Sequence, residues 1–294
     1  IEELFTMIDQ RRKKGLVNQP ATGAPPRRMA TDYDEILRSA PQVKSHPRVR
    51  ELWSNVTLIE PGSSGRAALA EGPTVYTGSL QGFLTRRTWK SGGFQVDWSV
   101  PLGRAIEAIE RTDQTLVVGS KRGLALVDAQ RGTLLRETVG IGSVTDVEVG
   151  DLIPEVPGLE IAARADQDIL HVESLDGGAQ LSSTVVGTGG TMRFAELGGQ
   201  RRLFIPLARG HVAGFRFVKT AAHGWIPEAT WLSEYLAQEL TAMVVGEIAG
   251  QQRVVAGGEG GPTLAVIGPA GKVVDRITLG TWVETIAPWA GQQL

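Results

Sequence analysis

The sequence TLVVGSKRGLALVDAQRGTLLRETV, residues 115–139, decides the fold. Three runs rich in leucine and β-branched residues, 116–119, 124–128 and 134–139, have the composition of pleated, half-buried strands. The two polar segments between them, Ser-Lys-Arg-Gly and Ala-Gln-Arg-Gly, each end on a glycine that tolerates a positive φ. Two tight turns that join three strands predict an antiparallel meander.

The same meander recurs along the chain. The turns between the second and third strands fall at Gly82, Gly123, Asp168, Gly210 and Gly260, at spacings of 41, 45, 42 and 50 residues. Repeats of about 40 to 50 residues are typical of propeller blades. With 37 glycines in 294 residues, the composition also suits a fold with many tight turns. We therefore predict an all-β protein, a β-propeller of five units.

Each unit also needs an opening strand. Similar candidates occur at 106–109, 144–149, 192–197 and 240–245, and a fifth at 283–287 has no second strand after it. The first unit, with strands near 74–77, 83–89 and 95–100, shows no similar opening strand. Pairing the terminal strand with this unit predicts five four-stranded blades closed by the C-terminal strand, which removes free sheet edges.

Two alternatives to this closure stay open. If residues 52–59 supply the first opening strand, the terminal strand is surplus, or it begins a sixth blade of a longer protein. A β-sandwich or another repeat architecture also fits strands of this length.

The chain divides into a tail, residues 1–50, and the propeller region, residues 51–294. Leu4, Phe5 and Ile8 share one helical face, and a basic run that starts with Arg11 and Arg12 follows them. A proline-rich segment, residues 18–28, then predicts an extended linker. We expect a partly helical, extended tail whose helix either packs on its own domain or docks onto a protein partner or a membrane surface.

Composition excludes several function classes. The net charge of −2 gives no global field that would attract nucleic acid. The chain has no cysteine, which excludes disulfides, thiol nucleophiles and thiolate metal sites. No apolar run reaches about 18 residues, so we expect no transmembrane segment in this chain. We favour a periplasmic or extracellular location over the cytoplasm, since the absence of cysteine is compatible with an oxidising compartment.

Two segments carry a family resemblance. LVVGSKRGLALVDAQRGTLLRE resembles the repeat of the quinoprotein-like (PQQ-repeat) propellers, in which a strand ending in Asp-Ala precedes a Gly turn and a Leu-Leu strand. VTDVEVGDLIPEVPGLEIAARADQDILHVESLDGG is similar to the FG-GAP, integrin-type repeat, and LTAMVVGEIAGQQRVVAGGEGGPTLAVIGPAGKVVDRI has the same outline. The resemblance implies a propeller over about 240 residues without implying one function.

The resemblance also raises the question of a cofactor. FG-GAP repeats hold calcium with a loop of alternating acids, but here residues 150–158 supply only Asp151 and Glu155, fewer oxygens than the ion needs. The quinoprotein enzymes have a wider ring, acids around calcium and often a vicinal disulfide. We therefore expect neither metal nor cofactor, and a plain turn at residues 150–158.

No catalytic constellation is visible in the sequence. The four histidines form no HExxH-type spacing, and His171 and His211 are expected in strands as half-buried structural residues. Inward carboxylates are the enzymatic alternative, since five-bladed propellers include glycoside-cleaving enzymes. The candidates on opening strands are Glu107, Asp146, Glu148, Glu196 and Glu284.

Residues after the third strand of the fourth unit depart most from the repeat. Trp231 and Tyr235 have helical spacing behind Pro227, so we expect a helical insertion. With Trp225, these aromatic residues are the best local candidates for a partner surface. Alternatively, the helix covers the outer edge of its own blade.

Three hypotheses for the function follow. The favoured one is a noncatalytic scaffold that binds other protein subunits in a larger, bacterial envelope-associated assembly through its tail and its insertion. The second is a carbohydrate-binding, lectin-like propeller, for which a strand with Arg86, Arg87, Trp89 and Lys90 offers aromatic and basic side chains, although a solvated outer strand also explains them. The third is a glycoside-cleaving enzyme.

Overall fold

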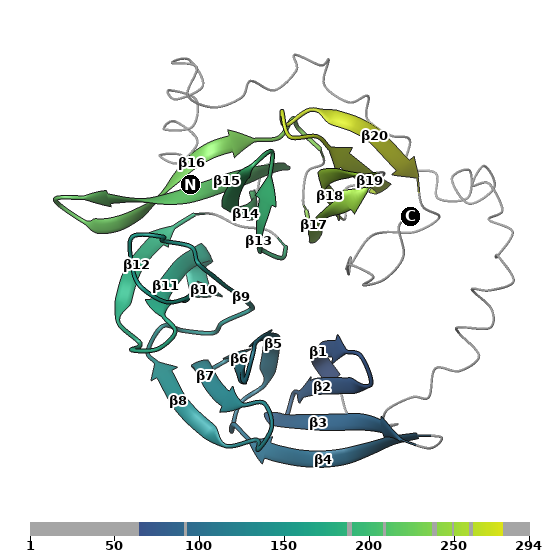
Figure 1. Ribbon diagram of the computed structural model, residues 1–294, viewed down its shortest axis with the longest axis vertical. Helices are drawn as coiled ribbons and strands as arrows, with labels where there is room; N and C mark the ends of the chain where they lie inside the picture. Colours follow the sequence, from purple (N-terminus) through teal and green to yellow (C-terminus); the bar gives the residue numbers. More distant parts are fainter. Residues whose placement is uncertain are drawn as a thin grey trace, which may run out of the picture. The chain divides into compact units, whose positions relative to one another are not determined.

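The computed structural model describes residues 65–90, 93–186, 190–207, 210–236, 240–248, 250–258 and 261–278. In this part of the chain, the strands form five four-stranded antiparallel sheets, the blades of a five-bladed β-propeller (Figure 1). The all-β, five-bladed propeller predicted from the repeats is confirmed. The predicted tail, residues 1–50, lies outside the described residues.

Within each blade, the four strands pair in sequence order. The first blade contains β1 (Gly65–Glu71), β2 (Thr74–Ser79), β3 (Phe83–Lys90) and β4 (Gly93–Pro101), and the second contains β5 (Ile106–Thr112), β6 (Thr115–Ser120), β7 (Gly123–Asp128) and β8 (Leu134–Val139). The third contains β9 (Asp146–Gly150), β10 (Glu160–Ala165), β11 (Ile169–Ser174) and β12 (Gln180–Val185). The fourth contains β13 (Arg193–Leu197), β14 (Gln200–Leu207), β15 (His211–Thr220) and β16 (Gly224–Leu232). The fifth contains β17 (Ala242–Ile248), β18 (Gln251–Gly258), β19 (Gly261–Ile267) and β20 (Val273–Thr278).

The five predicted turns each join a second strand to a third strand. Gly82, Gly123 and Gly210 have φ values of 85, 133 and 70°, which favour glycine. Asp168, with φ of 60°, ends the short 3-10 turn η1 (Asp166–Asp168). The fifth predicted turn, Gly260, lies outside the described residues, in the interval between β18 and β19. The order of the strands around the five positions agrees with the repeat register read from the sequence.

The opening strand of the first blade differs from the prediction. Strand β1 fills this place and pairs with β2 over residues 65–79, while β3 occupies the other edge of β2. The place beside β2 that the prediction gives to residues 283–287 is therefore filled by β1. Residues 283–287 and the alternative strand at 52–59 themselves lie outside the described residues. The sequence of β1, GRAALAE, was missed because alanine and glycine have low β-propensity.

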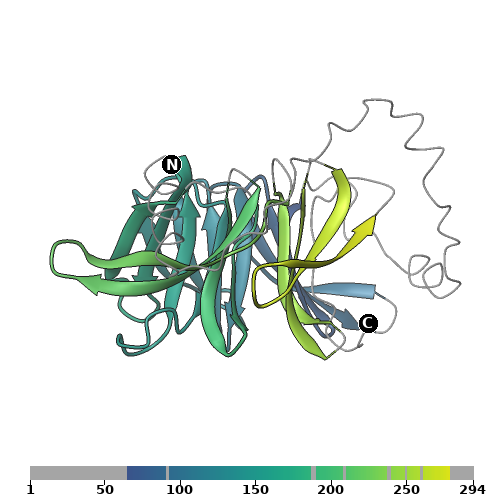
Figure 2. The same cartoon turned by 90° about the horizontal axis from the view of Figure 1, so that it is seen from above.

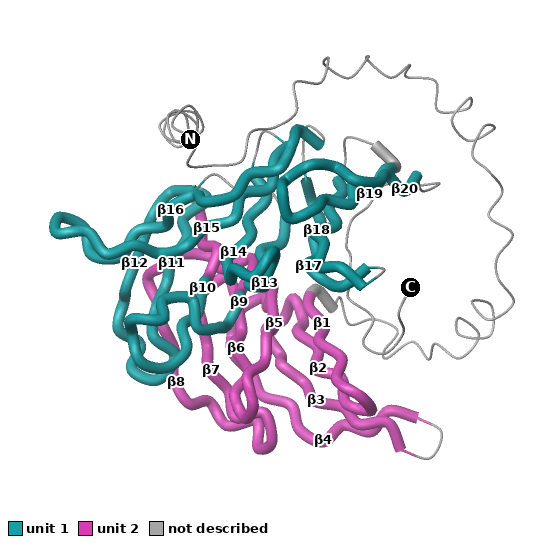
Figure 3. The backbone as a smooth tube through the Cα atoms, turned by 45° about the horizontal axis from the view of Figure 1, so that its top comes forward, with its two compact units in different colours: residues 1–38, 148–162, 167–294 teal, residues 39–147, 163–166 magenta. Residues whose placement is uncertain are grey.

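Two compact units divide the chain (Figure 3). Among the described residues, unit 2 comprises 65–147 and 163–166, which include the first two blades. Unit 1 comprises 148–162 and the residues from 167 onward, which include the fourth and fifth blades and most of the third. Each unit has its own apolar core.

In unit 2, the core lies between the first and second blades, where β5 packs against β1 and β2. Tyr76, Leu84, Ile106, Leu116 and Val127 are almost completely buried there. Burial of each such side chain contributes about 1.5–3 kcal/mol. This core supports the two outer hairpins of the unit, β3–β4 and β7–β8.

In unit 1, strand β14 is buried on both faces. Leu203, Ile205 and Leu207 pack into the core shared with the third blade, and Phe204 packs into the core shared with the fifth blade. The alternation follows from the two-residue period of a strand. The far end of the long β15–β16 hairpin reaches beyond the other strands of its sheet (Figure 2).

Candidate functional site

Large apolar side chains that remain exposed are concentrated in unit 2. Eleven occur among the described residues, and seven of them belong to this unit. The seven are Leu80, Phe83, Trp89, Val96, Leu134, Leu135 and Val139. Because clustered apolar surface marks interaction sites, we take the outer hairpins of unit 2 as the candidate site.

The first part of the site is the hairpin surface, formed by Trp89, Phe94 and Val96 near the tip of the β3–β4 hairpin. Trp89 and Phe94 are cross-strand partners, and their rings make an edge-to-face contact with centroids 5.2 Å apart. The side chains of Trp89 and Val96 are 43% and 57% exposed. An aromatic pair held in register offers rigid contact area at a small cost in conformational entropy.

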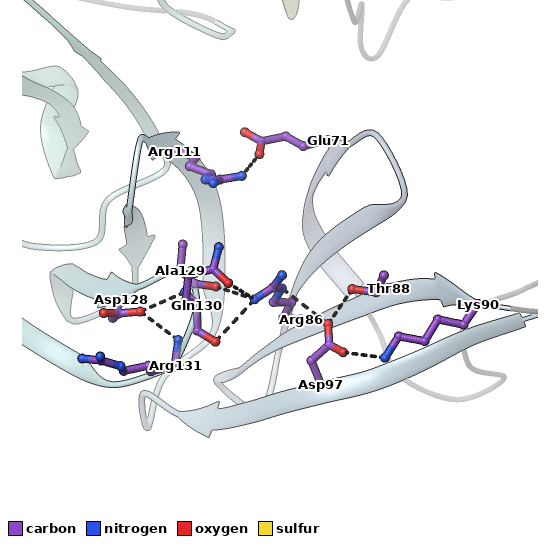
Figure 4. Close-up of polar contacts among 10 residues, drawn as sticks. All are labelled: Glu71, Arg86, Thr88, Lys90, Asp97, Arg111, Asp128, Ala129, Gln130 and Arg131. Atoms are coloured by element: carbon purple, nitrogen blue, oxygen red, sulfur yellow. Dashed lines mark hydrogen bonds and ion pairs between the residues drawn. The ribbon is translucent and has the colours of Figure 1, made fainter.

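A bulge gives Asp97 its central position in this hairpin. Arg87 pairs with Val96 and Arg86 pairs with Trp98, so Asp97 is the extra residue between them. Its carboxylate accepts a hydrogen bond of 2.6 Å from Thr88 Oγ1 and lies 3.4 Å from Arg86 Nε and 3.6 Å from Lys90 Nζ (Figure 4). Bulges re-aim side chains in this way.

Arg86 connects the hairpin to the β7–β8 turn. Its Nη1 donates to Gln130 Oε1 at 3.0 Å and to the Ala129 carbonyl at 3.3 Å (Figure 4). Asp128 Oδ1 in turn accepts the backbone amides of Gln130 and Arg131 at 2.9 and 2.8 Å. The bond from the Arg131 amide is the main reason that the pKa of Asp128 lies below its ordinary value. The turn therefore has a defined conformation and a fixed place beside the hairpin.

Close packing supports the same junction. The indole of Trp98 lies over Gly132, where a Cβ atom would come within 2.7 Å of the ring and φ is 68°. Tyr76 lies 6.1 Å from Trp98 between ring centroids, and the Arg111 guanidinium lies 6.0 Å from the Tyr76 ring centroid and pairs with Glu71. Burial raises the pKa of Tyr76.

The second part of the site is the β8 surface, formed by Leu134, Leu135 and Val139. Strand β8 is the last strand of its sheet and pairs with β7, with a bulge at Leu135. Leu135 and Val139 are each 56% exposed. Arg122 and Glu137 lie beside them, with Arg122 Nη2 3.7 Å from Glu137 Oε2. The β8 surface therefore presents apolar side chains at the outer margin of the blade.

The predicted basic strand is β3, the third strand of its blade and not the outermost. Arg86 and Lys90 pair with Asp97, so they are not isolated cations. Arg87 is buried and donates to Thr77 Oγ1 at 2.6 Å. Trp89 is the member of this set whose side chain contributes to the hairpin surface.

The predicted helical insertion in the fourth blade is wrong. Residues 224–232 form strand β16, which pairs with β15 from Thr220 to Ala213. The proline at 227 and the spacing of the aromatic residues indicate a helix, but the pairing with β15 decides the conformation. Trp231 is buried, and its Nε1 donates to the Pro269 carbonyl at 2.7 Å.

The other two predicted partner-binding aromatics, Trp225 and Tyr235, are more exposed than Trp231. Trp225 is half-buried, packs against the core, and has Lys219 Nζ 5.9 Å from its ring centroid. Tyr235 is 38% exposed and makes an edge-to-face contact with His211. Their role in partner binding stays a prediction. The predicted tail residues Leu4, Phe5, Ile8, Arg11 and Arg12 lie outside the described residues.

Glu160 organises the loop that resembles a calcium site. Its Oε2 accepts the backbone amides of Leu152 and Ile153 at 2.8 and 3.1 Å. The side chain is fully buried, and burial raises its pKa. Of the two acids that remain in this loop, Glu155 is exposed and Asp151 is half-buried. Within the described ranges, no group of three or more His, Asp or Glu side chains has an arrangement that could hold a metal.

The candidate carboxylates of the opening strands have separate environments. Glu148 Oε1 lies 2.7 Å from Arg193 Nη1, and its Oε2 accepts the Phe194 amide at 2.9 Å. Asp146 is buried, Glu107 is half-buried and Glu196 is exposed. Glu284 lies outside the described residues.

Both strand histidines have structural contacts. His171 Nε2 lies 3.0 Å from Glu173 Oε2, and both side chains are buried. His211 Nδ1 donates to the Ser233 carbonyl at 3.0 Å.

Sequence comparisons identify no family. No protein-family model matches the chain, and no curated protein matches it. Many solved structures are similar in fold, and two of them serve as examples. The computationally designed protein Ika8 has a TM-score of 0.57 at 13% sequence identity, and the match covers 78% of this chain and 66% of the designed chain. U3-55K has a TM-score of 0.58 at 8% sequence identity, and the match covers 77% of this chain and 71% of U3-55K. This chain thus spans slightly less than two thirds of the designed protein. At such low identity, the similarity shows the fold alone.

In the described part of the chain, no helix is long and apolar enough to span a bilayer.

Proposed function

We propose that this chain is a noncatalytic scaffold that binds other protein subunits through the hairpin surface and the β8 surface. The observation that carries the proposal is the concentration of exposed apolar side chains in unit 2, on hairpins held by the Arg86 contacts. A rigid support keeps the entropic cost of binding small, and aromatic anchors such as Trp89 often dominate contact energy.

The chemistry of the buried charges supports a scaffold more than an enzyme. Glu148 is paired with Arg193, Glu160 accepts two backbone amides, and Arg202 donates to Thr230 Oγ1 and the Leu197 carbonyl. Each of these contacts joins elements of the fold. The glycoside-cleaving alternative needs two carboxylates on either side of a substrate, and none of these contacts forms such a pair.

The tail and the fourth blade extend the proposal. Residues 1–50, with the predicted helix, and the aromatics Trp225 and Tyr235 are further docking elements. We place the assembly at a bacterial envelope, in the periplasm or outside the cell, because an apolar helix face that ends in basic residues suits a partner at a membrane surface. We also propose that the blades are degenerate relatives of PQQ and FG-GAP repeats.

Purification of tagged chains from their native cells tests the proposal. Leu135→Asp places a charge in the β8 surface, and Val185→Asp on β12 is the matched control because Val185 is 51% exposed. We expect the wild type and the control to retain the same protein partners and Leu135→Asp to lose at least one. A chain without residues 1–50 tests the tail in the same way. Identical partners in all four preparations contradict the proposal.

The carbohydrate alternative has its own test. Trp89 is exposed beside Lys90 and Asp97, and such aromatic and polar side chains also suit a sugar ligand. A glycan array probed with the wild type and with Trp89→Ala separates the two functions. Binding that is lost in the variant favours the lectin.

A further inference from the structure

The β8 surface differs from the outer strands of the other blades. β4 carries Asp97 at its bulge, β12 has a Ser-Ser-Thr run, β16 contains Pro227, and β20 contains Asp275 and Arg276. Charges, proline and polar residues are the usual means of keeping an edge strand from binding other chains. β8 also contains charges, Arg136 and Glu137, and β20 also has exposed apolar side chains, Val274 and Ile277, but β8 begins with two adjacent exposed leucines, Leu134 and Leu135.

The charge around these leucines is positive, although the whole chain has a net charge of −2. Residues 121–139 contain four basic and two acidic side chains. Both acids already have partners: Asp128 accepts two backbone amides of the turn, and Glu137 lies 3.7 Å from Arg122. Lys121 and Arg131 are exposed.

The basic side chains lie at both ends of β8. Arg131 is in the turn that leads into the strand, three residues before Leu134. Lys121 and Arg122 precede Gly123, which pairs with Val139 at the other end. Their positions flank the apolar side chains along the length of the strand.

We propose that the β8 surface binds an extended segment of another protein, with apolar side chains at its centre and carboxylates toward both ends. The apolar residues of this segment contact Leu134, Leu135 and Val139, and its acids lie near Arg131 at one end and Lys121 at the other. The inference rests on the proposed function and adds the chemistry of the partner. Such charge complementarity selects the partner and speeds association.

Selection from a phage-displayed library of random linear peptides on the full wild-type chain tests the proposal. We expect enriched peptides to combine apolar residues with acidic ones and to bind less tightly as salt is added. Leu135→Glu should weaken them by about tenfold or more, because it removes apolar contact and repels their acids. The control Val274→Glu on β20, whose wild-type side chain is 55% exposed, should bind them as the wild type does.

Arg131→Glu tests the charge without touching an apolar contact. It should weaken acidic peptides several-fold and make the salt dependence smaller. Circular dichroism and thermal unfolding confirm that each variant is folded. Any of four results overturns the inference. The selection enriches basic or neutral peptides, it enriches no peptide, Leu135→Glu binds the peptides as tightly as the wild type does, or the β8 surface binds a glycan and no peptide. The scaffold function has a separate readout, which is the loss of co-purified subunits in Leu135→Asp. That loss is expected whether or not the subunits bind through an acidic segment.

Discussion

Removal of the Glu160 carboxylate should destabilise the third blade. In Glu160→Ala, the amides of Leu152 and Ile153 lose the acceptor that now lies 2.8 and 3.1 Å away. Both residues are buried, so water does not replace the acceptor without a rearrangement of the loop. Each buried donor left unsatisfied costs about 1–3 kcal/mol, so we expect a loss of about 2–6 kcal/mol in the free energy of unfolding.

Glu160→Gln is the matched control. It keeps an oxygen that can accept both amides, and it places an amide nitrogen where Oε1 has no hydrogen-bond partner. We expect its stability to fall between those of the wild type and Glu160→Ala. Urea unfolding followed by circular dichroism gives the three values, with equal m-values as the check that the transitions are comparable. A Glu160→Ala protein within about 0.5 kcal/mol of the wild type would refute this account of the loop.

The pH dependence gives a second readout of the same site. Burial is the main cause that raises the pKa of Glu160 in the folded state above its ordinary value of 4.5. Between these two pKa values the folded state binds more protons than the unfolded state, so the contribution of Glu160 to stability falls as the pH rises. The wild type should therefore gain stability relative to Glu160→Gln when the pH is lowered from neutral to about 4. A difference that is independent of pH would contradict the buried carboxylate.

Three further substitutions test the packing and the site. Gly132→Ala should lower stability by about 2 kcal/mol or more, because its Cβ meets the Trp98 indole and φ is positive; thermal unfolding measures the loss. Trp231→Phe should cost about 1–2 kcal/mol in urea unfolding, because the bond to the Pro269 carbonyl is lost. Trp89→Ala should change stability by less than about 1 kcal/mol and still weaken partner capture in the tagged-chain purification, since Trp89 is exposed. A well-folded Trp89→Ala chain that captures every partner would exclude this residue from the interface.

The blade count could be predicted because local sequence sets the turns. In the first four blades a glycine or aspartate with positive φ marks the central turn, as at Gly123 and Asp168, and the interval between two such turns is the length of a blade. The first opening strand could not be predicted in this way. β1 forms because β2 and β5 pack against it, while its own alanine-rich sequence has little preference for a strand.

The candidate site could be predicted only in part. Trp89 and Trp231 are both flanked by strand residues, and the sequence alone does not distinguish the exposed indole from the buried one. Tertiary packing decides this, since Trp231 contacts Phe204 in the core of unit 1. The bulge at Asp97 also has no local signal, although the consecutive leucines before Arg136 could have drawn attention to β8.

Site-specific photocrosslinking in native cells tests the scaffold function most directly. A photoreactive amino acid at position 135 would lie in the β8 surface, and the same group at position 185 on β12 would serve as a control of similar exposure. We predict that irradiation links position 135, and not position 185, to a discrete second protein that mass spectrometry can identify. Equal labelling at the two positions, or no protein adduct at position 135, would contradict docking through unit 2.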